Sequence, residues 1–284
     1  MKRRVKSVVK KFFDILKKPE MSILPGQLAF YLLLSLIPIM ILCLLIASNF
    51  VNNTIVMQEF SSFLPSSLWN IIKPLITDAG NSSSSLNFEF VMVCYLLLAS
   101  NGPISIIVTS NEMYKIKDHN MIYIRIKAFF MTIIILALLL FMILIPVFGD
   151  TILKALFRFF KLSYGQEFYW YFYKFLKIFI SFVFVYIFIK LIYTIAPNKK
   201  IQSDTTTLGA VFTSIGWISA TGIFSFYIGN IAKYNILYGN FANILILLLW
   251  IYLLAYLFVV GMALNINKYS FYKEQEKLKM EVEE

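Results

Sequence analysis

The feature that most constrains this chain is a succession of long apolar stretches with little or no charge. A bilayer core about 30 Å thick is crossed by about 20 helical residues, and each backbone polar group in it needs a partner within the protein. Stretches of this kind cover residues 27–49, 90–110, 128–149, 170–196, 205–232 and 242–266. The fourth is the least clean, because it contains Lys174, Lys177 and Lys190. The sequence therefore predicts an all-α polytopic membrane protein with six transmembrane helices.

Composition excludes most other classes of protein. Hydrophobic residues make up 60% of the chain and charged residues 14%, whereas typical soluble domains are roughly 25% charged. Cys43 and Cys94 lie inside apolar runs, where we expect small buried side chains, and a single histidine (His119) gives no basis for a metal site. The chain contains no P-loop, GxSxG or HExxH motif. We therefore predict no enzyme, no catalytic residue, no metal and no cofactor.

The segments outside the predicted spans differ in character. Residues 1–20 form a basic amphipathic segment, residues 21–268 contain the transmembrane domain, and residues 269–284 are a charged tail in which acidic and basic side chains alternate. Residues 59–77 and 152–162 have the spacing of short amphipathic helices that lie in the membrane interface.

The net charge of +11 has two interpretations, membrane orientation or nucleic-acid binding. Six spans place both termini on one side, and most of the 26 Lys and Arg residues fall on that side. The positive-inside rule then places both ends in the cytoplasm. The basic segment 1–20 is expected to attract anionic lipid headgroups, at about 1 kcal/mol per basic residue near the surface. Nucleic-acid binding would need aromatic stacking platforms or a recognised fold, and neither is evident, so we predict no nucleic-acid partner.

Polar residues inside the spans are the candidates for function, because lipid forces them toward partners or water. Gln27, Tyr31 and Ser35 are spaced on one face of the first span, just ahead of Pro38. In the second span Gly102 and Pro103 predict a helix break near the middle of the membrane, beside the polar side chain of Asn101. With Tyr252 and Asn265 of the sixth span these residues would line a polar cavity. The alternative is that they form interhelical hydrogen bonds and proline kinks.

Two further patterns carry both a functional and a structural interpretation. Lys174 and Lys177 stand one turn apart among aromatic residues, either as contacts for an anionic group on the outer side or as lysines whose amines extend to the interface. In the fifth span Gly209, Thr213 and Gly216, followed by Ala220, form a face of small residues, which favours close helix packing.

Several segments together resemble the YihY/BrkB family of bacterial inner-membrane proteins. They are Gln-Leu-Ala-Phe-Tyr-Leu-Leu-Leu-Ser-Leu-Ile-Pro at 27–38, Asn-Glu-Met-Tyr at 111–114, Ala-Pro-Asn-Lys-Lys at 196–200 with Gly-Ala at 209–210, Tyr-Gly-Asn-Phe-Ala at 238–242, Trp-Ile-Tyr at 250–252 and Gly-Met-Ala-Leu-Asn at 261–265. The resemblance implies six transmembrane helices in the bacterial cytoplasmic membrane with both termini in the cytoplasm.

The resemblance implies less about activity. Members of the family have carried a ribonuclease BN label, others are linked to virulence or the cell envelope, and export or lipid translocation has been suggested. This chain departs from the family's Gly-Ala-Glu-Leu pattern near the end of helix six, where it has Ala263 in place of the glutamate. A mechanism that depends on protonation of that carboxylate therefore does not transfer to this chain.

The sequence thus leaves two hypotheses for function. The first is transport or translocation of a lipid, an amphiphile or a small solute through a polar cavity between helices one, two and six. The alternative is a non-transporting, envelope-organising membrane protein that acts on partners through its tail and its basic segment. A homo-oligomer is compatible with either, and ribonuclease activity is not expected.

Overall fold

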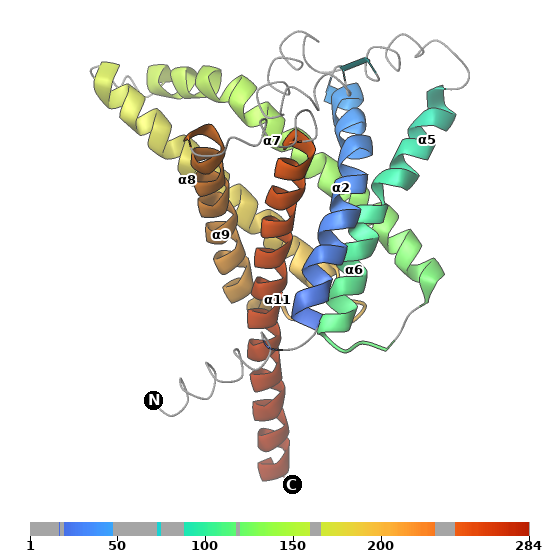
Figure 1. Cartoon of the computed structure of the whole chain (residues 1–284). Helices are drawn as coiled ribbons and strands as arrows, with labels where there is room; N and C mark the ends of the chain where they lie inside the picture. Colours follow the sequence, from blue (N-terminus) through green and yellow to red (C-terminus); the bar gives the residue numbers. More distant parts are fainter. Residues whose placement is uncertain are drawn as a thin grey trace. The chain divides into compact units, whose positions relative to one another are not determined.

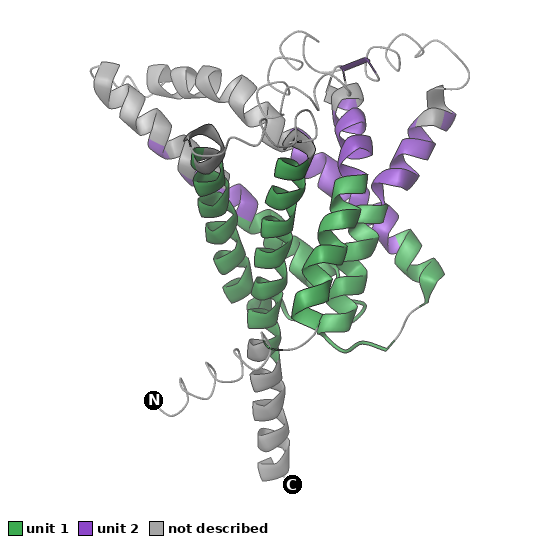
Figure 2. Ribbon diagram, in the orientation of Figure 1, with its two compact units in different colours: residues 1–34, 101–126, 186–284 green, residues 35–100, 127–185 purple. Residues whose placement is uncertain are grey.

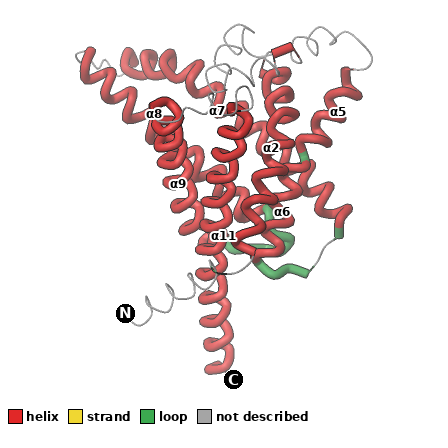
Figure 3. Tube along the Cα trace, viewed as in Figure 1, coloured by secondary structure: helices red, strands yellow, loops and turns green. Residues whose placement is uncertain are grey.

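The computed structural model describes residues 17, 20–47, 73–74, 88–117, 120–159, 166–230 and 242–283. Their regular structure is helical, with no strand among them (Figures 1 and 3). The main helices are α2 (Glu20–Ala47), α5 (Phe88–Ala99), α6 (Asn101–Met113), α7 (Met121–Phe159), α8 (Gln166–Ile195), α9 (Ser203–Asn230) and α11 (Ala242–Glu283). The predicted all-α membrane fold is confirmed.

Membrane-spanning segments account for most of these helices. Within the described residues, five segments are long and apolar enough to cross a bilayer: Glu20–Cys43, Met92–Met113, Met121–Leu140, Ser203–Phe224 and Leu245–Ile266. A shorter apolar segment, Phe182–Ile195, forms the end of α8, where the sequence predicts the fourth span. The predicted surface segments 1–20 and 59–77 lie largely outside the described residues, whereas α7 continues through most of 152–162 and α11 through most of the tail.

Two prolines in the spans behave differently. The second span is divided at Ser100 between α5 and α6, and the Ser100 hydroxyl donates to the Leu97 carbonyl oxygen at 2.6 Å. Gly102 and Pro103 are buried in the first turn of α6, where a backbone N–H has no helical partner to lose. We expected Pro38 to interrupt the first span as well, but α2 continues through it without a break. A membrane helix tolerates such a proline when neighbouring groups satisfy the freed carbonyl.

The chain divides into two compact units (Figure 2). Unit 1 consists of residues 1–34, 101–126 and 186–284, so it contains α6, α9, α11, the first half of α2 and the end of α8. Unit 2 consists of residues 35–100 and 127–185, and contains α5 and most of α7 and α8. The hydrogen bonds between α6 and α7, and those that join α8, α9 and α11, all lie in unit 1.

The most intimate contact in unit 1 joins α9 to α11. A Cβ atom added to Gly209 would collide with the Gly261 carbonyl oxygen and the Asn265 side chain, so the two backbones touch directly. A Cβ on Gly216 would lie 3.3 Å from the Leu257 side chain. The close-packing face predicted for the fifth span is therefore confirmed at these glycines. Small residues allow this approach, which maximises van der Waals contact where water supplies no driving force.

Side-chain hydrogen bonds reinforce the same contact at intervals of four residues along α9. The Gly209 N–H donates to Asn265 Oδ1 at 2.7 Å, Thr213 Oγ1 to the Leu257 oxygen at 3.3 Å, Trp217 Nε1 to the Leu254 oxygen at 2.9 Å, and Trp250 Nε1 to Thr221 Oγ1 at 3.4 Å. From α8, the buried Tyr193 hydroxyl donates to the Phe258 oxygen at 2.6 Å and lies 2.8 Å from Thr213 Oγ1. We call this set of contacts the α9–α11 seam.

Candidate functional site

An arginine inside an apolar helix defines the candidate site. Arg125 lies in the span Met121–Leu140, and its Nη1 atom donates to Asn101 Oδ1 at 3.0 Å. Asn101 is the first residue of α6, directly after the break at Ser100. An ionisable side chain within a membrane helix often has a function or a specific partner, and an arginine this close to the end of a span can also extend to the membrane interface.

Local capping explains why Arg125 belongs to the helix. The Asn120 side chain accepts hydrogen bonds from the N–H groups of Ile122 and Tyr123, at 3.1 and 3.2 Å, which is the pattern of an N-cap. The cap starts α7 at Met121, seven residues before the predicted third span. Lys115, with φ of 54°, turns the chain between the end of α6 and this cap.

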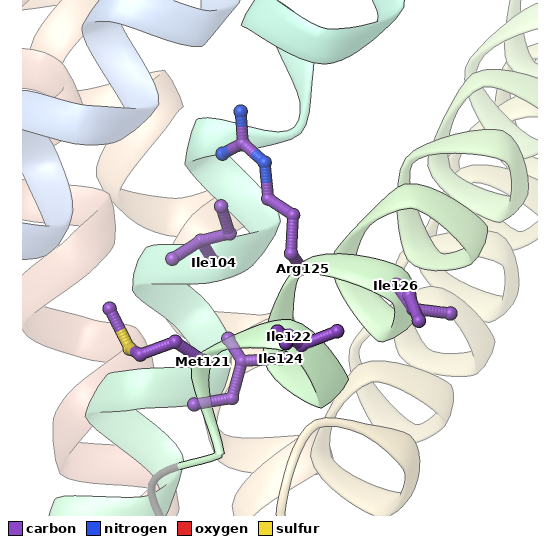
Figure 4. A pocket seen from close by; sticks show the side chains of 6 residues that line it. All are labelled: Ile104, Met121, Ile122, Ile124, Arg125 and Ile126. Atoms are coloured by element: carbon purple, nitrogen blue, oxygen red, sulfur yellow. The ribbon is translucent and has the colours of Figure 1, made fainter.

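An apolar pocket adjoins the arginine. It has a volume of about 430 Å³ and is lined by Ile104, Met121, Ile122, Ile124, Arg125 and Ile126. In Figure 4 the Arg125 side chain extends from α7 toward α6, with Ile104 beside it, Ile122 and Ile124 below it, and Ile126 to its right. The lining thus combines aliphatic side chains with one guanidinium group.

The guanidinium group retains donors for a ligand. Its partner Asn101 is neutral, and no carboxylate of the described residues forms a salt bridge with it. A guanidinium has five N–H donors in a planar fork, which suits two-point binding of a carboxylate or phosphate. Asn101 therefore orients the cation without neutralising it.

Comparisons with known proteins place the chain in a family. The family described as virulence factor BrkB matches residues 12–283. The chain belongs to this BrkB family. Its relatives include the ribonuclease-like protein YfkH of Bacillus subtilis, which is 29% identical over 242 residues, 84% of this chain and 87% of YfkH. A UPF0761 membrane protein of Alteromonas mediterranea is 24% identical over 250 residues, 85% of this chain and 81% of that protein. No solved structure matches.

Two of the segments that carry the resemblance to the BrkB family, 111–114 and 196–200, meet at one end of α6. Asn111 Oδ1 accepts a hydrogen bond from the Asn198 N–H at 2.8 Å, which joins the motif after the second span to the loop before α9. The Tyr114 ring packs edge-on against Tyr269 of α11, with ring centroids 6.0 Å apart. This α6–α11 junction adjoins the Gly209–Asn265 contact of the seam.

The residues predicted to line a cavity have different surroundings. Gln27 and Tyr31 are exposed on α2, and Tyr252 is exposed on α11, near Gly26 of α2. Ser35 is buried in unit 2. Asn101 binds Arg125, whereas Asn265 is fully buried and binds the Gly209 N–H. The structure therefore assigns Asn101 to the candidate site and Asn265 to the seam, and a cavity shared by all six stays a prediction.

Other expected functional residues are placed less fully. Lys174 and Lys177 lie in α8, but their side chains are outside the described part of the structure. Cys43 and Cys94 are free thiols. Within the described residues no group of three or more His, Cys, Asp or Glu side chains could hold a metal ion.

Sequence reasoning missed Arg125 as a site residue. With the third span placed at residue 128, Arg125 counted only as one of the positive charges in a loop. The missed signal is Asn120 followed directly by an apolar run, a helix-start pattern that places Arg125 in the second turn of a membrane helix.

Proposed function

We propose that this BrkB-family membrane protein binds an amphiphile with an anionic headgroup and moves it across the bilayer. The headgroup binds Arg125, and the apolar part of the molecule occupies the adjoining pocket. One observation carries the proposal. Arg125 belongs to a membrane helix, is held by Asn101 and lines an apolar pocket between α6 and α7.

Physical chemistry favours this class of ligand over a hydrophilic solute. Aliphatic walls give no hydrogen bonds to a sugar or an amino acid, but they match acyl chains. A phosphate would satisfy the remaining guanidinium donors in a two-point, charge-assisted interaction, which is roughly twice as strong as a neutral hydrogen bond. The first turn of α6 also directs a positive helix dipole toward the region of Asn101.

The proposal includes an orientation and a location. Both termini lie in the cytoplasm, and the protein lies in the bacterial cytoplasmic membrane. The distribution of Lys and Arg along the chain supports this orientation. In the same arrangement, the basic segment 1–20 collects anionic lipids at the cytoplasmic surface. Labelling of single cysteines introduced near each terminus, in intact and in permeabilised cells, tests it: labelling of either terminus in intact cells contradicts it.

Lipid movement in proteoliposomes tests the function. The assay follows transfer of fluorescent phosphatidylglycerol, which is anionic, and fluorescent phosphatidylcholine, which is zwitterionic, between the leaflets. Loss of a charged hydrogen bond costs about 1.5–3 kcal/mol, so Arg125→Gln is expected to slow phosphatidylglycerol transfer by about tenfold or more. The matched control is Lys200→Gln, which removes an exposed cation after α8 and is expected to have no effect. Equal transfer rates for Arg125→Gln and the unmodified protein contradict the proposal.

A further inference from the structure

Four polar atoms at the α6–α11 junction are buried and lack a hydrogen-bond partner among the described residues. They are Ser110 Oγ, Asn111 Nδ2, Tyr114 Oη and Asn265 Nδ2. Ser110, Asn111 and Asn265 have no exposed surface at all. Each buried polar group left without a partner costs about 1–3 kcal/mol, so a concentration of four in one place calls for a specific explanation.

These groups belong to two helices that pack against each other. Ser110 and Asn111 are in the last turn of α6, and Tyr114 follows directly after it. The Tyr114 ring packs against Tyr269, which is one helical turn beyond Asn265 on α11. The end of α6 therefore faces the part of α11 that carries Asn265.

The orientation of both asparagine amides is fixed by backbone donors. Asn111 Oδ1 accepts from the Asn198 N–H at 2.8 Å, and Asn265 Oδ1 accepts from the Gly209 N–H at 2.7 Å. An amide flip would set N–H against N–H, so the oxygens must take these positions. What each side chain leaves unpaired is its NH₂ group, which can only donate.

The tyrosine adds a third donor. Burial, reinforced by the neighbouring Tyr269, raises the pKa of Tyr114 above its ordinary value. The phenol therefore keeps its proton over the physiological range. Lys199 contributes positive charge at the edge of the junction, because its Nζ atom lies 5.9 Å from the centroid of the Tyr269 ring.

From this geometry we infer that the α6–α11 junction binds a compact inorganic anion. Asn111, Tyr114 and Asn265 supply neutral donors, Ser110 adds a hydroxyl, and Lys199 supplies charge nearby. An anion accepts from several donors at once, whereas a buried water molecule accepts at most two hydrogen bonds and typically makes about three in all. The site lies at the opposite end of α6 from Asn101, roughly 15 Å along the helix, and does not depend on the proposed lipid site.

Thermal unfolding of the full-length protein in detergent tests the inference. The probes are sodium chloride and sodium phosphate, each compared with sodium gluconate at equal ionic strength, because gluconate is too bulky for a closed site. At least one compact anion is expected to raise the unfolding temperature in a saturable way. No difference from gluconate at any concentration means that only water occupies the junction, which overturns the inference.

Tyr114→Phe is the decisive variant, because it removes one donor and keeps the ring against Tyr269. In sodium gluconate the unfolding temperature of Tyr114→Phe is expected to be at least as high as that of the unmodified protein. Addition of the compact anion is expected to raise the unfolding temperature of the variant much less than that of the unmodified protein. Asn111→Asp, which keeps the oxygen for the Asn198 N–H, is expected to abolish the anion effect.

Two controls separate this site from other effects. Ser214→Ala removes a buried hydroxyl that already donates to the Ala210 oxygen, and Arg125→Gln removes the proposed lipid contact; both retain the anion effect. An equal anion effect in Tyr114→Phe and Ser214→Ala contradicts the inference. If Asn111→Asp does not fold, equilibrium binding of radioactive chloride is compared between Tyr114→Phe and the unmodified protein. Equal binding to both proteins also contradicts the inference.

Discussion

The α9–α11 seam and the candidate site of Arg125 and Asn101, between α6 and α7, are both polar features of membrane helices, but they differ in how many hydrogen bonds join the helices. In the seam, successive turns of α9 place a donor or acceptor against α11, and two glycine backbones touch. At the α6–α7 site a single hydrogen bond holds a cation beside an apolar pocket. The comparison teaches that repeated hydrogen bonds between closely packed helices fix the fold, whereas a charge with spare donors is available to a ligand.

The largest loss of stability is expected from a substitution at the glycine contact in the seam. A Cβ on Gly261 meets Thr213 Oγ1, the Tyr193 hydroxyl and the Gly209 carbonyl oxygen, all held by packed helices. Overpacking costs about 1–3 kcal/mol and occasionally more, and we expect Gly261→Ala to reach about 3 kcal/mol or to prevent folding. Thermal unfolding and size-exclusion chromatography measure it.

Gly222→Ala is the matched control, because a Cβ at Gly222 meets nothing within 4 Å. The better helix propensity of alanine is expected to stabilise this variant by up to about 1 kcal/mol. Equal stability of the two variants would show that the seam is not tightly packed.

The next largest effect on stability is expected at one of two asparagines that the sequence analysis assigned to the same cavity. Asn265→Leu removes the acceptor for the Gly209 N–H and is expected to lower the free energy of unfolding by about 1–3 kcal/mol. Asn101→Leu frees Arg125 and is expected to change stability by less than about 0.5 kcal/mol while lowering lipid transfer. Chemical denaturation in detergent and the proteoliposome assay measure the two quantities. A loss of stability in Asn101→Leu together with a loss of lipid transfer alone in Asn265→Leu would contradict the two assignments.

A smaller loss of stability is expected when the hydrogen bonds between α8 and the seam are removed. Tyr193→Phe preserves the ring and removes the hydroxyl that donates to the Phe258 oxygen and meets Thr213. Hydrogen bonds between membrane helices contribute about 0.6 kcal/mol on average, so we expect a loss of about 1 kcal/mol. Tyr31→Phe, at an exposed tyrosine, serves as its control in the same denaturation experiment. Equal stability of the two variants would exclude an energetic role for the Tyr193 hydroxyl.

The sequence predicted the features that depend on segment length and residue size. Apolar runs of about 20 residues give membrane helices in any context, and the small residues from Gly209 onward favour close packing whatever the partner. Both predictions agree with the structure, in which the second span is divided between α5 and α6 at Ser100. Pro38 behaved differently because a proline within a helix does not by itself end it when its surroundings satisfy the freed carbonyl.

The candidate site was harder to predict because it depends on where helices begin and which faces meet. The cap by Asn120 moves the start of α7 and turns a loop charge, Arg125, into a helix residue. Asn101 and Asn265 look alike in sequence, but their partners come from different helices. Those pairings are tertiary, and one sequence without its fold carries no information on them.

The most direct test of the central claim is native mass spectrometry of the detergent-solubilised protein with bound lipids. The protein is mixed with equal amounts of phosphatidylglycerol and phosphatidylcholine, and the retained lipids are counted for the unmodified protein, Arg125→Gln and Lys200→Gln. We predict a preference for phosphatidylglycerol that Lys200→Gln keeps and Arg125→Gln loses, with unfolding temperatures unchanged. An undiminished preference in Arg125→Gln would contradict the account.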